Sequence, residues 1–376
     1  MKKIRNSNFE LMRIISMFLI VIWHIIMHGN VLENCANPAI KIILEMIMFL
    51  IVIHVNSFVL VSGYFQSESK FKLSKALKVL FQVIFYSILI LCVSIKLGWV
   101  QNYNIVTFFN NITLKALSNY WFINMYLIMY VFSDFINKFI NRLEKDEYKK
   151  FLIIGFILLS IIPFITGYQV LHNSGYTFFN FIYLYMIGGY LKKYPLKKTY
   201  HFKKMSVNGY RTLLMFGFFS LAIFNYLINH FAIEINGMSS LFNEISARIN
   251  ASYLDYATPF VIIQTILYFE YFKTLNIKSK FINKISTCTF GIYLIHDNEI
   301  IRDHIYKILK IDNGLFYGYS IFVRILIVGI IIFISCLMIE LIRSIISKLI
   351  LKTKPLKYIK EKFKSFLNSF NFNINW

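Results

Sequence analysis

The sequence has few of the residues that mark disulfide-bonded, metal-binding or multidomain proteins. Its 376 residues include only four cysteines and five prolines. Cys35, Cys92, Cys288 and Cys336 form no Cys-x-x-Cys pair, so neither a disulfide framework nor a zinc site is indicated. No stretch rich in proline, or in glycine and serine, marks a linker. We therefore expect one transmembrane domain over residues 7–345, without an internal repeat.

Acidic residues are also scarce, with 18 Asp and Glu against 40 Lys and Arg, and the formal net charge is +22. A charge of this size can indicate a nucleic-acid partner. Here, however, the basic residues gather in short segments between apolar runs. Their distribution therefore argues against nucleic acid and for a membrane protein.

Apolar residues are abundant instead. They make up 57% of the chain, and the mean hydropathy is +0.59, well above that of ordinary soluble proteins. Several runs are long enough to span a bilayer. We predict an all-α membrane protein with a bundle of ten transmembrane helices near residues 9–29, 40–64, 76–98, 119–140, 151–168, 178–191, 211–232, 256–272, 285–301 and 317–347. The first run lacks a small-residue cleavage site, so we expect a retained span and not a signal peptide.

The basic residues fall almost entirely on one side of this predicted topology. One set of segments, near residues 2–5, 70–75, 142–150, 192–204 and 273–284, is rich in lysine and arginine. The other set contains only Lys115, Arg248, Arg302, Lys307 and Lys310. The positive-inside rule then places both termini in the cytoplasm. The tail, residues 346–376, alternates lysines with apolar residues and is typical of a basic amphipathic segment on an anionic leaflet.

The first predicted span contains an arginine and a histidine on one face. Ten residues separate Arg13 from His24, so the side chains lie about three turns, or about 16 Å, apart. Burying an arginine in a span costs about 2.5–3.5 kcal/mol on the insertion scale, so such residues usually face a wet cavity or a partner. We interpret this face as an active-site wall, with Glu10 one turn before Arg13 as a neutralising partner. The alternative is a snorkelling arginine and a histidine bonded to a carbonyl.

Histidines near this face also allow a metal hypothesis. His28 follows His24 by four residues, and His54 or Glu45 of the second span could complete a zinc site. The sequence has no His-Glu-x-x-His motif and few acidic residues nearby. We therefore expect no metal.

Three further segments combine polar and aromatic residues at span ends. The second span ends in Ser62-Gly63-Tyr64-Phe65, and lysines including Lys72 and Lys75 follow. These lysines are either ordinary cytoplasmic anchors or a rim for a phosphorylated cosubstrate. Aromatic residues crowd 119–127, as at a membrane interface. His296 and Asp297 end the ninth predicted span, in a capping or a functional role.

Four segments together resemble the acyltransferase 3 family of integral membrane acyltransferases. They are NFELMRIISMFLIVIWH (8–24), FVLVSGYF (58–65), YWFINMYL (120–127) and TFGIYLIH (289–296). The first is similar to the opening of stand-alone Gram-positive members that O-acetylate surface polysaccharides. The resemblance covers nearly the whole chain.

This resemblance implies roles for the matching residues. Arg13 and His24 match an arginine–histidine pair that the family requires for activity. Lys72 and Lys75 stand nearest to a paired basic motif associated with acyl-CoA, although arginine is usual there in some branches. Asp134 stands where relatives often have proline. We count Glu10, Ser62 and His296 as further candidates.

The expected function is an O-acyltransferase of the bacterial cytoplasmic membrane. Acetyl-CoA is the expected donor, and the acceptor is a hydroxyl of a surface glycan or of its lipid-linked precursor. His24 is the expected general base. A transporter or flippase of lipid-linked sugars is the alternative, with Arg13 and His24 on an ion path. The sequence leaves open the acceptor, the acyl chain length, direct transfer versus an acyl-enzyme, and the oligomeric state.

Overall fold

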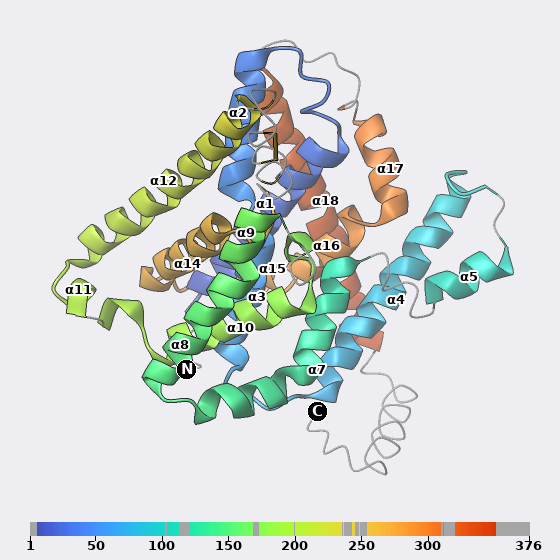
Figure 1. Cartoon of the computed structure of the whole chain (residues 1–376). Coiled ribbons are helices and arrows are strands. Elements are labelled where there is room, and N and C mark those ends of the chain that lie inside the picture. Colours follow the sequence, from blue (N-terminus) through green and yellow to red (C-terminus); the bar gives the residue numbers. More distant parts are fainter. Residues whose placement is uncertain are drawn as a thin grey trace.

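A computed structural model describes residues 6–101, 104–112, 120–167, 173–198, 200–234, 236, 243–244, 248, 254–309, 311 and 320–350. These residues form helices and connecting turns, with no strand among them (Figure 1). The predicted amphipathic tail falls outside the described residues from 351 onward. The helices are α1 (Asn8–His28), α2 (Pro38–Ile51), α3 (His54–Gln66), α4 (Leu73–Lys96), α5 (Ile105–Ile112), α7 (Trp121–Arg142), α8 (Lys145–Phe156), α9 (Ile162–Thr166), α10 (Phe178–Lys193), α11 (Tyr200–Lys203), α12 (Val207–Glu234), α14 (Pro259–Thr274), α15 (Lys280–Ser286), α16 (Thr289–His296), α17 (Glu299–Ile308) and α18 (Ser320–Ile350).

Six described segments are long and apolar enough to cross a membrane: Asn8–His28, Pro38–Gln66, Leu73–Lys96, Lys145–Thr166, Val207–Ala232 and Ser320–Leu349. The other four predicted spans correspond to α7, α10, α14 and α16. Three of these elements are shorter, and α7 carries several polar residues. The all-helical membrane architecture is thus confirmed, whereas the count of ten spans stays a prediction.

Two of the six segments are not uniform helices. The second is interrupted at Val52 and Ile53, where α2 ends and α3 begins. The fourth contains a π-helical stretch over Ile157–Ile161, just before Pro163. Proline has no N–H and its ring clashes with the carbonyl four residues earlier, so a local change of helical pattern is expected there.

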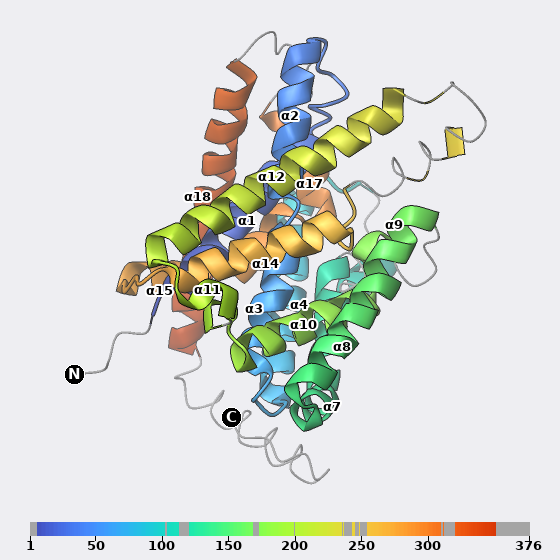
Figure 2. The same cartoon turned by 60° about the vertical axis from the view of Figure 1, so that its left-hand side comes forward.

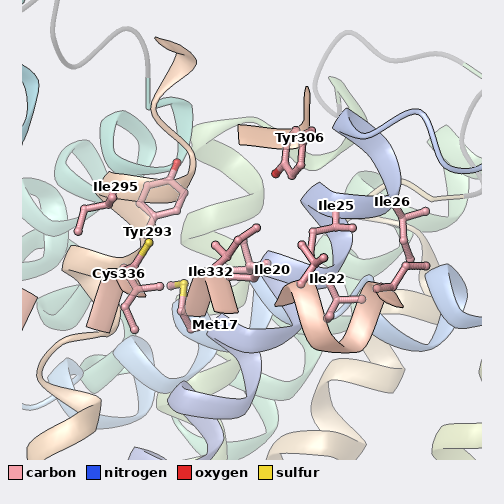
Figure 3. Packing of buried hydrophobic residues seen from close by; sticks show 14 of the residues in the cluster. Met17, Ile20, Ile22, Ile25, Ile26, Tyr293, Ile295, Tyr306, Ile332 and Cys336 are labelled. Atoms are coloured by element: carbon pink, nitrogen blue, oxygen red, sulfur yellow. The ribbon is translucent and has the colours of Figure 1, made fainter. Parts of the chain in front are cut away.

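The core lies around α1, which packs against α3, α14, α16 and α18. Figure 3 shows part of this packing: Met17 and Ile20 of α1, Ile332 and Cys336 of α18 and Tyr293 of α16 belong to one apolar cluster. A second apolar cluster joins α3, α7, α10 and α14. The long helix α12 lies along the outside of this bundle, against α14 and α2 (Figure 2).

Contacts along α1 fix the directions of its neighbours. The centre of the Phe9 ring lies 5.2 Å from that of the Tyr64 ring, near the end of α3, and Trp23 contacts His54, at the beginning of α3, so α1 and α3 are antiparallel. Phe18 contacts Phe333, and Gly329 lies beside Ile22, so α18 is also antiparallel to α1. The beginning of α1 and the end of α18 therefore lie at the same end of the bundle.

Candidate active site

A cavity of about 280 Å³ lies between α1, α3, α7 and α16. One face of α1 forms a wall of it with Arg13, Met17, Ile20 and His24, which follow one another at helical spacing. Much of the remaining lining is aromatic: Trp121, Phe122, Tyr126, Tyr256, Phe290 and Tyr293. The structure thus brings Arg13 and His24 to one cavity, at positions about 16 Å apart along α1.

The Arg13 end of the cavity lies near the end of α3. The guanidinium carbon of Arg13 is 5.9 Å from the centre of the Phe65 ring, within the range of a cation–π contact. Glu10 lies one turn earlier on α1 and is buried. Ser62 lines the cavity. Its hydroxyl donates to the Phe58 carbonyl at 2.9 Å.

The His24 end contains a cluster of ionisable side chains. His24 Nδ1 lies 3.1 Å from His296 Nε2 and 3.4 Å from Asp297 Oδ1. Arg302 Nη1 in turn lies 3.4 Å from Asp297 Oδ1. His296 and Asp297 are almost fully buried. His24 therefore belongs to a polar network that joins α1 to the turn between α16 and α17.

Buried hydrogen bonds hold this turn in place. The eight-residue helix α16 ends at His296, and the Asn298 side chain caps α17 by accepting from the Ile300 N–H. Asn298 also donates to the Tyr120 hydroxyl at 2.9 Å, and this hydroxyl donates to the Leu294 carbonyl at 2.8 Å. A short apolar helix that ends in His-Asp-Asn thus positions the side chains of His296 and Asp297 against α1.

Comparison with protein families identifies the family of this chain. A family model described as an acyltransferase domain matches residues 6–341. The chain belongs to the acyltransferase 3 family. The comparison with curated proteins gave no match, and the comparison with solved structures gave none either. The chain is therefore a membrane acyltransferase, and the family match includes every residue that lines the cavity.

The acyltransferase's two candidate lysines lie outside the cavity wall. Lys72 and Lys75 are exposed at the start of α4, and Val79, farther along the same face of α4, lines the cavity. Helix α7 fixes this segment: the Tyr130 hydroxyl lies 3.1 Å from the Lys72 backbone N–H, and Asp134 accepts from the Phe71 N–H. Asp134, in the position where relatives often have proline, thus ties α7 to the lysine-bearing loop.

Ser62 is not adjacent to His24. It follows His54 by eight residues in one continuous helix, and so lies about 12 Å farther along α3. Because α3 is antiparallel to α1, Ser62 lies toward the Arg13 end of the cavity. No described contact supports Ser62 as a nucleophile paired with His24.

One group in the acyltransferase could hold a metal ion. Ligand atoms of His24, His28 and Asp297 all lie within 4.8 Å of one another, and two imidazoles with a carboxylate are ligands that zinc accepts. The third member is Asp297 and not His54 or Glu45, the residues weighed from the sequence. His28 is exposed, and its ring centre lies 5.1 Å from that of His24.

Sequence reasoning did not place Asp297 beside His24, and it considered His54 only as a possible metal ligand. Asp297 was expected at a span end, in a capping or a functional role, and its contact with His24 depends on a fold that joins distant segments. His54 lines the cavity, is 1% exposed and lies between Trp23 and Tyr256. Its Nδ1 lies 2.5 Å from the Ile51 carbonyl oxygen. A histidine within an apolar run was the available signal for His54.

Proposed function

We propose that this membrane acyltransferase transfers an acyl group, in the commonest case acetyl, from cytoplasmic acyl-CoA to a glycan hydroxyl. The acceptor is a cell-surface polysaccharide or its lipid-linked precursor. The proposed location is the cytoplasmic membrane of a bacterium, with both termini in the cytoplasm. The observation that carries the proposal is the single cavity that Arg13 and His24 both line.

The two ends of this cavity suit two parts of the reaction. The Arg13 end adjoins the lysine-bearing segment that begins α4, and positive charges there suit the phosphates of coenzyme A. A phosphorylated donor held there would extend its thioester arm along the cavity toward His24. The cavity's aromatic and aliphatic lining suits the apolar part of such an arm.

The proposed chemistry is a direct transfer with His24 as base. His24 takes the proton of the acceptor hydroxyl while that oxygen attacks the thioester carbonyl carbon. The carbon–sulfur bond then breaks, and the leaving thiolate receives the proton from the imidazolium. A base of this kind typically contributes about 10²–10⁴-fold to the rate.

The transporter hypothesis has less support. Arg13 and His24 could also line an ion path, but membership in an acyltransferase family does not favour transport. No described feature of the bundle favours it either, because the described spans include no pair of matching broken helices at the cavity.

The first test compares surface polysaccharide from cells with the intact gene, with a deletion and with His24→Ala. Proton NMR measures the O-acetyl methyl signals. We expect these signals to disappear in the deletion and to fall at least about 100-fold in His24→Ala, because the base is lost.

The matched control is His230→Ala. His230 is an exposed histidine of α12 that lies outside the cavity and pairs with Glu234, so acetylation should stay at the wild-type level. Immunoblots of membranes would check that each variant inserts normally. A His24→Ala protein that inserts and still acetylates would exclude His24 as the base. Unchanged acetylation with failed polymer export in the deletion would favour a transporter.

A further inference from the structure

The two ring nitrogens of His296 take part in different hydrogen bonds. Nδ1 lies 2.7 Å from the backbone carbonyl oxygen of Ile292, and Nε2 lies 3.1 Å from Nδ1 of His24. A carbonyl oxygen can only accept, so the proton of a neutral His296 ring is on Nδ1. The Nε2 atom is then an acceptor, and the bond between the two histidines must be donated by His24.

His24 Nδ1 faces a second acceptor as well. Asp297 Oδ1 lies 3.4 Å away and is shared with Arg302. A neutral imidazole has one N–H. Both neighbours of His24 Nδ1, the Nε2 atom of His296 and the carboxylate of Asp297, are acceptors, so the proton of His24 lies on Nδ1. The other nitrogen, Nε2, keeps its lone pair, and no hydrogen bond to it occurs within the described parts of the chain.

The ring of His296 cannot easily turn away from this arrangement. It is 1% exposed, and its centre lies 6.3 Å from the ring of Tyr293. The following residues are held through Asn298 and Tyr120. Imidazole tautomers are set by the hydrogen bond that the other nitrogen makes, and a rigid acceptor sets them most strongly.

We propose that His296 is a positioning residue that keeps the proton of His24 on Nδ1, so that Nε2 is free to take the acceptor's proton. This inference rests on the proposed function of His24 as base. A proton on Nε2 would instead block the nitrogen that the reaction needs. In serine proteases, the wrong histidine tautomer lowers kcat about 10⁴-fold.

Two substitutions of His296 separate the roles of its nitrogens. In His296→Gln, the amide reaches the position of Nε2 and can accept from His24. In His296→Asn, the amide reaches only the position of Nδ1, so the bond to the Ile292 carbonyl is kept and the bond to His24 is lost. Purified protein in detergent is assayed with acetyl-CoA and a hydroxyl acceptor.

We expect His296→Asn to lower kcat at least about 10-fold, while the KM for acetyl-CoA changes less than about 2-fold. The loss is smaller than 10⁴-fold because Asp297 remains as an acceptor. His296→Gln should retain kcat within about 3-fold. The double variant His296→Asn, Asp297→Asn should be slower than either single variant.

The matched control is His304→Asn. His304 also places Nδ1 near the carbonyl four residues earlier, 2.8 Å from that of Ile300, but it stacks on Trp99 outside the cavity. Its substitution should leave kcat unchanged. If His296→Gln and His296→Asn lose activity equally, together with thermal stability, His296 is structural and the proposal is wrong.

A second measurement does not depend on activity. NMR of protein with ¹⁵N-labelled histidine, with the His24 signals identified by their absence in His24→Ala, reports which nitrogen carries the proton. A proton on Nδ1 of His24 in the wild type, which shifts toward Nε2 in His296→Asn, supports the proposal.

A proton on Nε2 of His24 in the wild type would overturn it. A zinc ion bound to His24, His28 and Asp297 in the purified protein would overturn it as well. An inactive His24→Ala with a fully active His296→Asn would overturn this inference alone, whereas an active His24→Ala would overturn the proposed function.

Discussion

Arg13 and His24 share one face of α1 but have different surroundings. Arg13 lies against the Phe65 ring, at the end of the bundle where α1 begins. His24 contacts two polar side chains at the other end of the cavity. We therefore expect substitutions at these two positions to change different kinetic constants.

Replacement of Arg13 should mainly weaken binding of the acyl donor. We expect Arg13→Ala to raise the KM for acetyl-CoA about 10-fold or more, since a hydrogen bond to a charged group contributes about 1.5–3 kcal/mol. Arg13→Lys should recover only part of the loss, because lysine lacks the bidentate fork. Steady-state kinetics of the purified variants would measure both.

Arg142→Ala is the control for this experiment, because Arg142 is exposed at the end of α7 and lies outside the cavity. Its KM should equal that of the wild type. An equal loss of folded protein and of activity in Arg13→Ala would instead assign Arg13 a structural role.

At the scale of single residues, the sequence predicted one helical face well and the contacts between distant segments poorly. Arg13 and His24 share a face because both lie on one continuous helix, and the spacing alone shows this. The pairing of His24 with His296 joins residues 272 positions apart, and no local pattern reveals it. His54 was considered only as a possible metal ligand, because its place in the cavity wall depends on how α3 packs against α1.

The crossing of α3 and α10 depends on two glycines. A Cβ atom on Gly63 would collide with the backbone carbonyl of Tyr185, and one on Gly188 would collide with the carbonyl of Leu60. Small residues let helix backbones approach closely in membranes. Each glycine thus permits the contact that fixes α3, and α3 carries His54 and Ser62 into the cavity wall.

We expect Gly63→Ala and Gly188→Ala each to destabilise the bundle by at least about 1–3 kcal/mol, because backbone atoms cannot move aside as side chains do. Thermal unfolding in detergent would show a lower Tm. Gly209→Ala in α12 is the control, because a Cβ atom added there would meet no backbone carbonyl. Its nearest neighbour would be the Ser206 hydroxyl oxygen, 3.1 Å away. Unchanged Tm values for both α3 and α10 variants would show that the helices can separate without cost.

The sequence predicted long helices better than broken ones. The helices α1, α4 and α18 follow apolar runs that continue for more than five turns, and their expected bounds are close to those observed. The break between α2 and α3 lies at two apolar residues, Val52 and Ile53, where hydropathy carries no signal. The ninth predicted span, 285–301, contains α16 but only the last two residues of α15 and the first three of α17, because the turns on either side of α16 are too short to register in hydropathy.

Basic residues concentrate at one end of the whole molecule. Lys72 directly precedes α4, Lys193 ends α10, Lys273 lies in the last turn of α14 and Lys280 begins α15. The beginning of α1 lies at this end as well, because the Ser7 N–H donates to the Ile277 carbonyl. Hydropathy and charge alone predicted this polarity of the bundle, which depends on composition more than on packing.

This polarity leads to a test of orientation in the membrane. Cys35 lies between α1 and α2, at the end opposite the lysines, and is partly exposed. The positive-inside rule places that end outside the cell. In a Cys92→Ser background, which removes the exposed cysteine of α4, a membrane-impermeant maleimide should label Cys35 in intact cells.

A second cysteine provides the matched comparison from the other end. Ser69 is exposed in the loop between α3 and α4, next to the basic segment. In a background with Cys35→Ser and Cys92→Ser, Ser69→Cys should be labelled only after the membrane is permeabilised. The reverse pattern would place Arg13 on the outer side, where cytoplasmic acyl-CoA is absent. It would therefore contradict both the topology and the assignment of Arg13, Lys72 and Lys75 to the acyl donor, while leaving membership in the acyltransferase family unaffected.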